Sequence, residues 1–160
     1  MKGDAEEGNR ILVVGVGNPI LSDDGIGIHV ARALKERNPG VSAEELPASG
    51  LELLDMVLGF DTVVIVDAIE TRGGTPGEIH ILDESDFERA VHGSSPHGIN
   101  IATALALGRK VAPDKMPERV VYVAVEAEDL LTVSESLTEK VAEALPKVVE
   151  MIERDFLSRS

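Results

Sequence analysis

Residues 11–25 have the sequence ILVVGVGNPILSDDG, and the fold class follows from this segment. A short aliphatic run that stops at a glycine predicts a buried β-strand over residues 11–16. The apolar spacing after Gly25 predicts a helix to Arg37, which Asn38-Pro39-Gly40 ends. A strand that leads through a short loop into a helix is typical of an α/β domain.

The alternation of strands and helices continues along the chain. Further strands are predicted over residues 41–46, 62–67, 78–82 and 119–125, and further helices over 51–58, 83–91, 99–111 and 137–156. The last helix contains Pro146, which we expect to kink or interrupt it. The pattern predicts an α/β fold with a mostly parallel sheet. We expect residues 1–9 to form a flexible tail and residues 10–160 a single domain.

Composition and charge narrow the possible functions. The chain has 160 residues, of which 43% are hydrophobic and 2% aromatic, so we expect an aliphatic core of buried parallel strands. Its formal net charge of −14 opposes binding to nucleic-acid phosphates. The sequence has no cysteine, which excludes disulfides and thiolate chemistry. It has neither a signal peptide nor an apolar run of about 20 residues, so we expect a cytoplasmic protein without a membrane partner.

Three polar residues are expected to meet at one edge of the sheet. Asp24 ends the loop after the first strand, Asp67 closes the strand predicted over 62–67, and His97 lies just before a predicted helix. Open α/β sheets bind ligands beyond the carboxyl ends of their strands, and right-handed crossovers return the chain to that side. Two carboxylates and an imidazole are a typical set of metal ligands. We expect Gly17 to shape the first loop.

Each of these residues also has a structural interpretation. Asp24 could cap the helix that follows it, and Asp23 is an equally good cap by sequence. Asp67 follows buried β-branched residues, so its carboxylate needs either a partner or an opening into a cleft. His97 could be an ordinary loop histidine. The combination favours a functional site, because chemistry and topology point to one place.

The glycines of the first loop also invite comparison with dinucleotide-binding proteins. After Gly15 and Gly17, the dinucleotide fingerprint needs a third glycine at the position where this chain has Ile20. Pro19 also removes a backbone donor that a phosphate could use. Binding of NAD or FAD is therefore not expected.

These motifs resemble the hydrogenase maturation endopeptidases, which trim a C-terminal peptide from the large subunit of nickel–iron hydrogenases. The resemblance runs from Ile11 to about Ile152. Its main segments are Val14-Gly15-Val16-Gly17-Asn18, Asp23-Asp24-Gly25-Ile26-Gly27, Val66-Asp67-Ala68, Pro96-His97-Gly98 and Val125-Glu126-Ala127. The resemblance implies a three-layer α/β/α sandwich with a twisted, mostly parallel five-stranded sheet, one strand of which can be antiparallel.

The resemblance also implies a site and a mechanism. Asp24, Asp67 and His97 are implied to be both the metal ligands and the catalytic residues. The implied metal is nickel, supplied by the hydrogenase large subunit precursor, so that cleavage follows metal insertion. Many members have glutamate where this chain has Asp24, and a glutamate after the histidine where it has Gly98. Either the metal or an aspartate carboxylate would activate the attacking water.

Two other functions stay open on the sequence alone. The first is a metal-dependent hydrolase that carries its own Zn²⁺ or Mn²⁺. The second is a non-enzymatic module that docks at the nickel site of the precursor. In each case we expect a monomer with no nucleic-acid partner.

Overall fold

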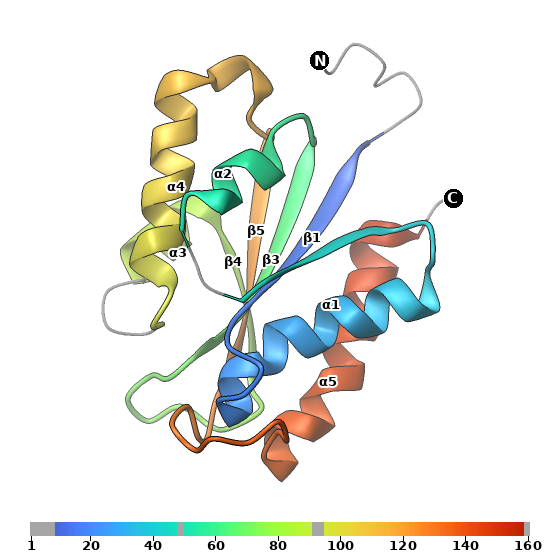
Figure 1. The fold of residues 1–160 in the computed structure, drawn as a ribbon, viewed down its shortest axis with the longest axis vertical. Helices are drawn as coiled ribbons and strands as arrows, with labels where there is room; N and C mark the ends of the chain where they lie inside the picture. The colour runs from blue at the N-terminus through green and yellow to red at the C-terminus, as the bar shows by residue number, and fades with distance from the viewer. Residues whose placement is uncertain (1–8, 48–49, 91–94, 159–160) are drawn as a thin grey trace.

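The computed structural model describes residues 9–47, 50–90 and 95–158, which form a three-layer α/β/α sandwich (Figure 1). Its described strands are β1 (Ile11–Val16), β2 (Ser42–Leu46), β3 (Thr62–Ile69), β4 (Ile79–Asp83) and β5 (Arg119–Glu126). Its described α-helices are α1 (Ile26–Arg37), α2 (Glu52–Val57), α3 (Glu84–Ala90), α4 (Gly98–Val111) and α5 (Glu139–Ile152). The predicted fold class is confirmed. Of the tail predicted over residues 1–9, only residue 9 is described. Val91, the last residue of the helix predicted over 83–91, also lies outside the described residues.

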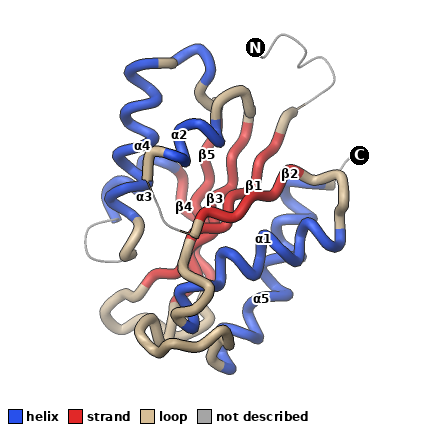
Figure 2. The backbone as a smooth tube through the Cα atoms, in the orientation of Figure 1, coloured by secondary structure: helices blue, strands red, loops and turns tan. Residues whose placement is uncertain are grey.

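The described strands form a five-stranded sheet in the order β2-β1-β3-β5-β4 (Figure 2). Strands β1, β2, β3 and β5 are parallel, and the edge strand β4 is antiparallel to β5. The carboxyl ends of the four parallel strands therefore share one edge of the sheet. The loops that follow these strands are brought together there.

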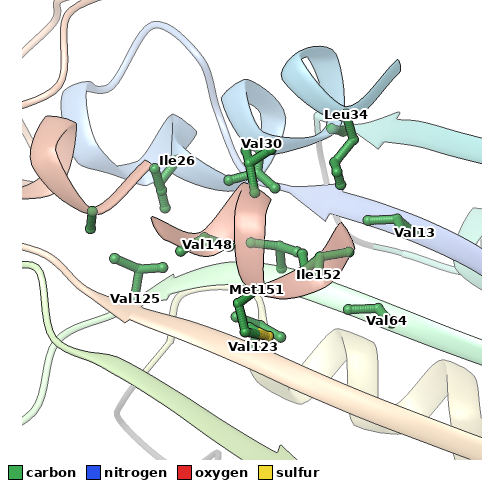
Figure 3. Packing of buried hydrophobic residues seen from close by; sticks show 14 of the residues in the cluster. Val13, Ile26, Val30, Leu34, Val64, Val123, Val125, Val148, Met151 and Ile152 are labelled. Atoms are coloured by element: carbon green, nitrogen blue, oxygen red, sulfur yellow. The ribbon is translucent and has the colours of Figure 1, made fainter. Parts of the chain in front are cut away.

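Side chains along each central strand alternate between two hydrophobic layers. Val13 and Val64 belong to the layer under α1 and α5, which Figure 3 shows from close by. Leu12 and Ile65 belong to the layer under α2, α3 and α4. Burial on both faces explains why the side chains of these strands are mostly aliphatic.

Strand β3 is longer than predicted. It continues two residues beyond Asp67 to Ile69, so Asp67 lies inside the strand and pairs with Ala124 of β5. The prediction that Asp67 ends the strand is wrong. An acidic residue is tolerated inside this buried strand because hydrogen-bond donors from neighbouring segments reach its carboxylate, as described below.

Helix α5 is not interrupted at Pro146, which lies within it. Packing of the apolar face of α5 against the sheet, on both sides of Pro146, outweighs the hydrogen bond that a proline removes. The chain continues past α5 as a π-helix, Glu153–Leu157. Within the described residues, no helix is both long and apolar enough to cross a membrane.

Candidate functional site

A cleft of about 650 Å³ opens at the edge of the sheet where the parallel strands end. Segments that follow β1, β2, β3 and β5 line it, together with the start of α4. The described lining residues are Asn18, Leu21, Asp24, Pro47, Glu70, Pro96, His97, Asn100, Glu128, Asp129, Leu130 and Leu131. The cleft therefore lies where the sequence predicted a site and contains two of the three predicted residues.

Asp24 lies in the tight 3-10 turn, Ser22–Gly25, that joins the first loop to α1. Its Oδ2 accepts a hydrogen bond from the backbone N–H of Asn18 at 2.9 Å. Gly17 permits this close turn, because its φ is 147° and a Cβ there would lie 1.9 Å from the carbonyl oxygen of Asp24. Within the described residues, no side chain caps α1, so the capping interpretation of Asp23 and Asp24 is wrong.

His97 directly precedes α4 and contacts Asp24. Its Nε2 lies 3.1 Å from Oδ2 and 3.2 Å from Oδ1 of Asp24. Burial lowers the pKa of His97, but the hydrogen bond to Asp24 and the charge of Asp67 outweigh burial and leave the pKa above its usual value. The contact with Asp24 therefore favours the protonated form of His97.

Asp67 is fully buried in β3. Its Oδ2 accepts hydrogen bonds from Oγ of Ser95 at 2.6 Å and from the hydroxyl of Tyr122 at 2.7 Å. Its Oδ1 accepts one from the N–H of Ala68 at 2.8 Å. Burial raises the pKa of Asp67 to about 6, although the charge of His97 and these hydrogen bonds lower it.

The three predicted residues are connected through Ser95. The hydroxyl of Ser95 donates to Asp67 and accepts from the backbone N–H of His97 at 3.1 Å. In residues 9–47, 50–90 and 95–158, no three His, Cys, Asp or Glu side chains form a group that could hold a metal ion. Asp24 and His97 are in contact, whereas both oxygens of Asp67 accept hydrogen bonds from other groups. Coordination of one ion by all three side chains stays a prediction.

The sequence analysis missed Ser95 and Tyr122. Tyr122 is the only tyrosine of the chain and lies in a predicted buried strand, where its hydroxyl needs a hydrogen-bond partner. That signal could have pointed to the buried carboxylate of Asp67. Ser95 lies two residues before His97, but nothing in the sequence shows which way its hydroxyl points.

Comparison with known sequences places the chain among the enzymes that mature hydrogenases. Residues 28–155 match the family model described as hydrogenase maturation protease. The hydrogenase 2 maturation protease of Escherichia coli (strain K12) is 34% identical over 125 residues, which cover 76% of this chain and 75% of that protein. The hydrogenase expression/formation protein HupD of Thiocapsa roseopersicina is 26% identical over 147 residues, which cover 89% of this chain and 65% of that protein.

Solved structures agree with the sequence matches. The hydrogenase maturating endopeptidase HybD from E. coli superimposes with a TM-score of 0.78 and 29% identity, over 91% of this chain and 90% of that one. The [NiFe] hydrogenase maturation protease HybD from Thermococcus kodakarensis has a TM-score of 0.79 at 23% identity, over 91% and 97% of the two chains, and supports the fold alone. The chain therefore belongs to the hydrogenase maturation protease family.

Proposed function

We propose that this chain removes a C-terminal peptide from the large subunit precursor of a nickel–iron hydrogenase. The supporting observation is the contact between Asp24 and His97 in a cleft at the carboxyl edge of the sheet, in a chain of this family. We place the reaction in the cytoplasm and assign it to a monomer. Size-exclusion chromatography with light scattering tests the monomeric state, and a stable dimer would contradict it.

Nickel bound in the precursor is the recognition element in this proposal. Imidazole nitrogen and carboxylate oxygen are donors that Ni²⁺ accepts, and His97 and Asp24 present both at the cleft. Asp67 would complete the set by exchanging the hydrogen bond of Ser95 or Tyr122 for the metal. The attacking water can be activated by the ion, or by an aspartate oxygen that is not a ligand.

The decisive experiment follows the mass of the precursor with and without nickel. We expect the protein to shorten the nickel-loaded precursor and to leave the nickel-free precursor intact. His97→Ala should abolish cleavage, whereas His29→Ala should retain it, because His29 lies on α1 and is not among the described residues of the cleft. A complex that forms without shortening would show a docking module instead of an enzyme.

The source of the metal is tested separately. Titration of Ni²⁺ by calorimetry should give weaker binding for His97→Ala than for the parent protein, and equal binding would remove His97 from the site. Elemental analysis of protein purified without chelators should show no stoichiometric metal. One tightly bound Zn²⁺ or Mn²⁺ per chain would instead indicate a hydrolase with its own metal.

A further inference from the structure

Two loops at the mouth of the cleft are joined by backbone hydrogen bonds. Leu21 and Ser134 form a parallel β-bridge. The N–H of Ser134 donates to the carbonyl of Ile20, and the N–H of Ser22 donates to the carbonyl of Ser134, both at 2.9 Å. Figure 1 shows the second loop, in orange, beside the start of α1. The loop after β5 is therefore fixed to the loop that carries Asp24.

A buried carboxylate anchors this pair of loops. Asp23 is fully buried, and its Oδ2 accepts hydrogen bonds from the N–H groups of Glu128 and Asp129, each at 3.0 Å, and from Oγ1 of Thr138 at 2.7 Å. Its Oδ1 accepts one from the N–H of Thr138 at 2.8 Å. Hydrogen bonds to a charged acceptor are strong, so the loop after β5 is held in one position next to the catalytic turn.

The joined loops expose three aliphatic side chains. Ile20 is 50% exposed, Leu131 is 85% exposed and Val133 is 78% exposed. The carboxylate of Asp129 accepts hydrogen bonds from the N–H groups of Leu131 and Thr132, which fixes the backbone that carries the most exposed of them. We call Ile20, Leu131 and Val133 the aliphatic rim. Exposed aliphatic side chains grouped on a rigid support are typical of a protein-binding surface.

The charge beside the aliphatic rim indicates the chemistry of the partner. Asp24, Glu70, Glu128 and Asp129 line the cleft, and no Lys or Arg occurs among its described lining residues. The whole chain carries a formal charge of −14. A second copy of this chain would be repelled, whereas a segment with aliphatic and basic residues is complementary to both features.

We propose that the aliphatic rim is the docking surface for the precursor segment next to the cleaved bond. Aliphatic side chains of that segment pack on Leu131 and Val133, and flanking Lys or Arg side chains face Glu128 and Asp129. This inference rests on the proposed function, because it takes the hydrogenase precursor as the partner. It adds a surface outside Asp24, Asp67 and His97 that sets affinity for the precursor and leaves the chemical step unchanged.

The test compares Leu131→Ser combined with Val133→Ser against Val111→Ser. Val111 is a matched control because it is 64% exposed and lies at the far end of α4, away from the described lining of the cleft. With nickel-loaded precursor, we expect the double variant to raise KM about tenfold or more and to keep kcat within about twofold, because about two aliphatic contacts are lost. Val111→Ser should change neither constant.

A separate variant tests the contribution of negative charge to precursor binding. Glu128→Gln should raise KM and should weaken the dependence of KM on NaCl concentration, because salt screens an attraction that this variant no longer makes. An equal dependence on salt in parent and variant would contradict the role of Glu128. An unchanged KM in the double variant, or an equal rise in Val111→Ser, would overturn the docking surface.

A direct binding measurement separates this inference from the proposed function. The dissociation constant for the precursor is measured by biolayer interferometry for the parent, the double variant and Val111→Ser. If the parent binds the precursor without cleaving it, the proposed function fails, and the docking surface stands only if the double variant alone binds about tenfold more weakly. If the parent neither binds nor cleaves the precursor, both proposals are overturned.

Discussion

At the scale of single residues, burial controls the behaviour of Asp67. Its pKa is raised from 3.8 to about 6 in the folded protein, so the folded state binds a proton more tightly than the unfolded chain does. The free energy of unfolding therefore falls as pH rises from about 4 to about 6, by up to about 3 kcal/mol from this group. Below about pH 4, Asp67 is protonated in both the folded and the unfolded state, and its stabilising contribution to the free energy of unfolding is fully present.

Asp67→Asn should remove this dependence. The amide oxygen can accept from Ala68, and the amide nitrogen can donate to the hydroxyls of Ser95 and Tyr122 after they rotate. Urea unfolding between about pH 4 and pH 7 should show the variant gaining stability over the parent as pH rises. Asp114→Asn removes one exposed negative charge and serves as the control. Parallel curves for parent and Asp67→Asn would contradict the raised pKa.

Asp23 gives a second prediction at this scale. Its carboxylate accepts four hydrogen bonds on two oxygens, and asparagine would place an N–H₂ group against the donors on one side. We expect Asp23→Asn to lower the free energy of unfolding by about 3 kcal/mol in chemical denaturation. A helix cap would account for about 1 kcal/mol only. A loss of that smaller size would contradict the anchoring role.

The sequence predicted the meeting of Asp24 and His97 but not the surroundings of Asp67. The first two lie on loops at one edge of a parallel sheet, and the topology of such sheets brings those loops together. The partners of Asp67 are a hydroxyl on β5 and one in the loop before α4. Strand order and side-chain direction decide those contacts, and neither can be derived from the local pattern of one segment.

At the scale of elements, the contact between β1 and α1 depends on two glycines. A Cβ on Gly15 would lie 2.0 Å from the carbonyl oxygen of Gly27, and a Cβ on Gly27 would lie 2.3 Å from that of Val66. The glycines that invited comparison with a dinucleotide fingerprint are therefore explained in part by helix–sheet packing. The helix can approach the sheet closely only because these side chains are missing.

Gly27→Ala tests this packing. In an exposed helix the change would stabilise the protein by about 1 kcal/mol, but here it forces Cβ into backbone atoms of two central strands. We expect a loss of about 3 kcal/mol or more, or failure to accumulate as soluble protein. Gly40→Ala is the matched control, because a Cβ there meets no atom within 4 Å. Equal melting temperatures for both variants would show that α1 can move away without cost.

Hydrophobic periodicity predicted the helices and strands well. Each long helix buries one apolar stripe, and the side chains of each central strand alternate between the two faces of the sheet. Local rules fail where a tertiary contact overrides them. Strand β3 continues past an acidic residue because Asp67 has hydroxyl partners, and α5 continues through Pro146 because its apolar face packs on the sheet. Neither contact is visible within a short window of sequence.

At the scale of the whole molecule, the strand order brings the site together. Strands β1 and β3 are neighbours although some 45 residues lie between them, and their carboxyl ends carry the loops of the cleft. A mostly parallel sheet was predictable from the alternation of strands and helices. One antiparallel strand was expected from the family resemblance, but not that it is β4 at the edge beside β5, because an antiparallel edge strand has no distinct local signal.

The charge of the whole molecule gives the last prediction. The chain has 29 Asp and Glu residues but only 15 Lys and Arg residues. Its acidic side chains therefore repel one another in the folded state. Described ion pairs such as Arg32–Glu45 and Arg37–Glu153 lie at the surface, so they add little to the free energy of unfolding. Raising NaCl from about 10 mM to about 300 mM shortens the Debye length from about 30 Å to below 10 Å, which should raise the melting temperature by roughly 3 °C.

Screening and ion binding are separated by changing the salt. KCl at equal ionic strength should give the same rise in differential scanning calorimetry, because screening depends on charge and not on the identity of the ion. If only NaCl or only KCl raised the melting temperature, a bound Na⁺ or K⁺ ion would be indicated instead. A melting temperature that falls with salt would show that attractive ion pairs outweigh the excess of acidic residues, and would contradict the assumption that a second copy of this chain is repelled from the acidic cleft.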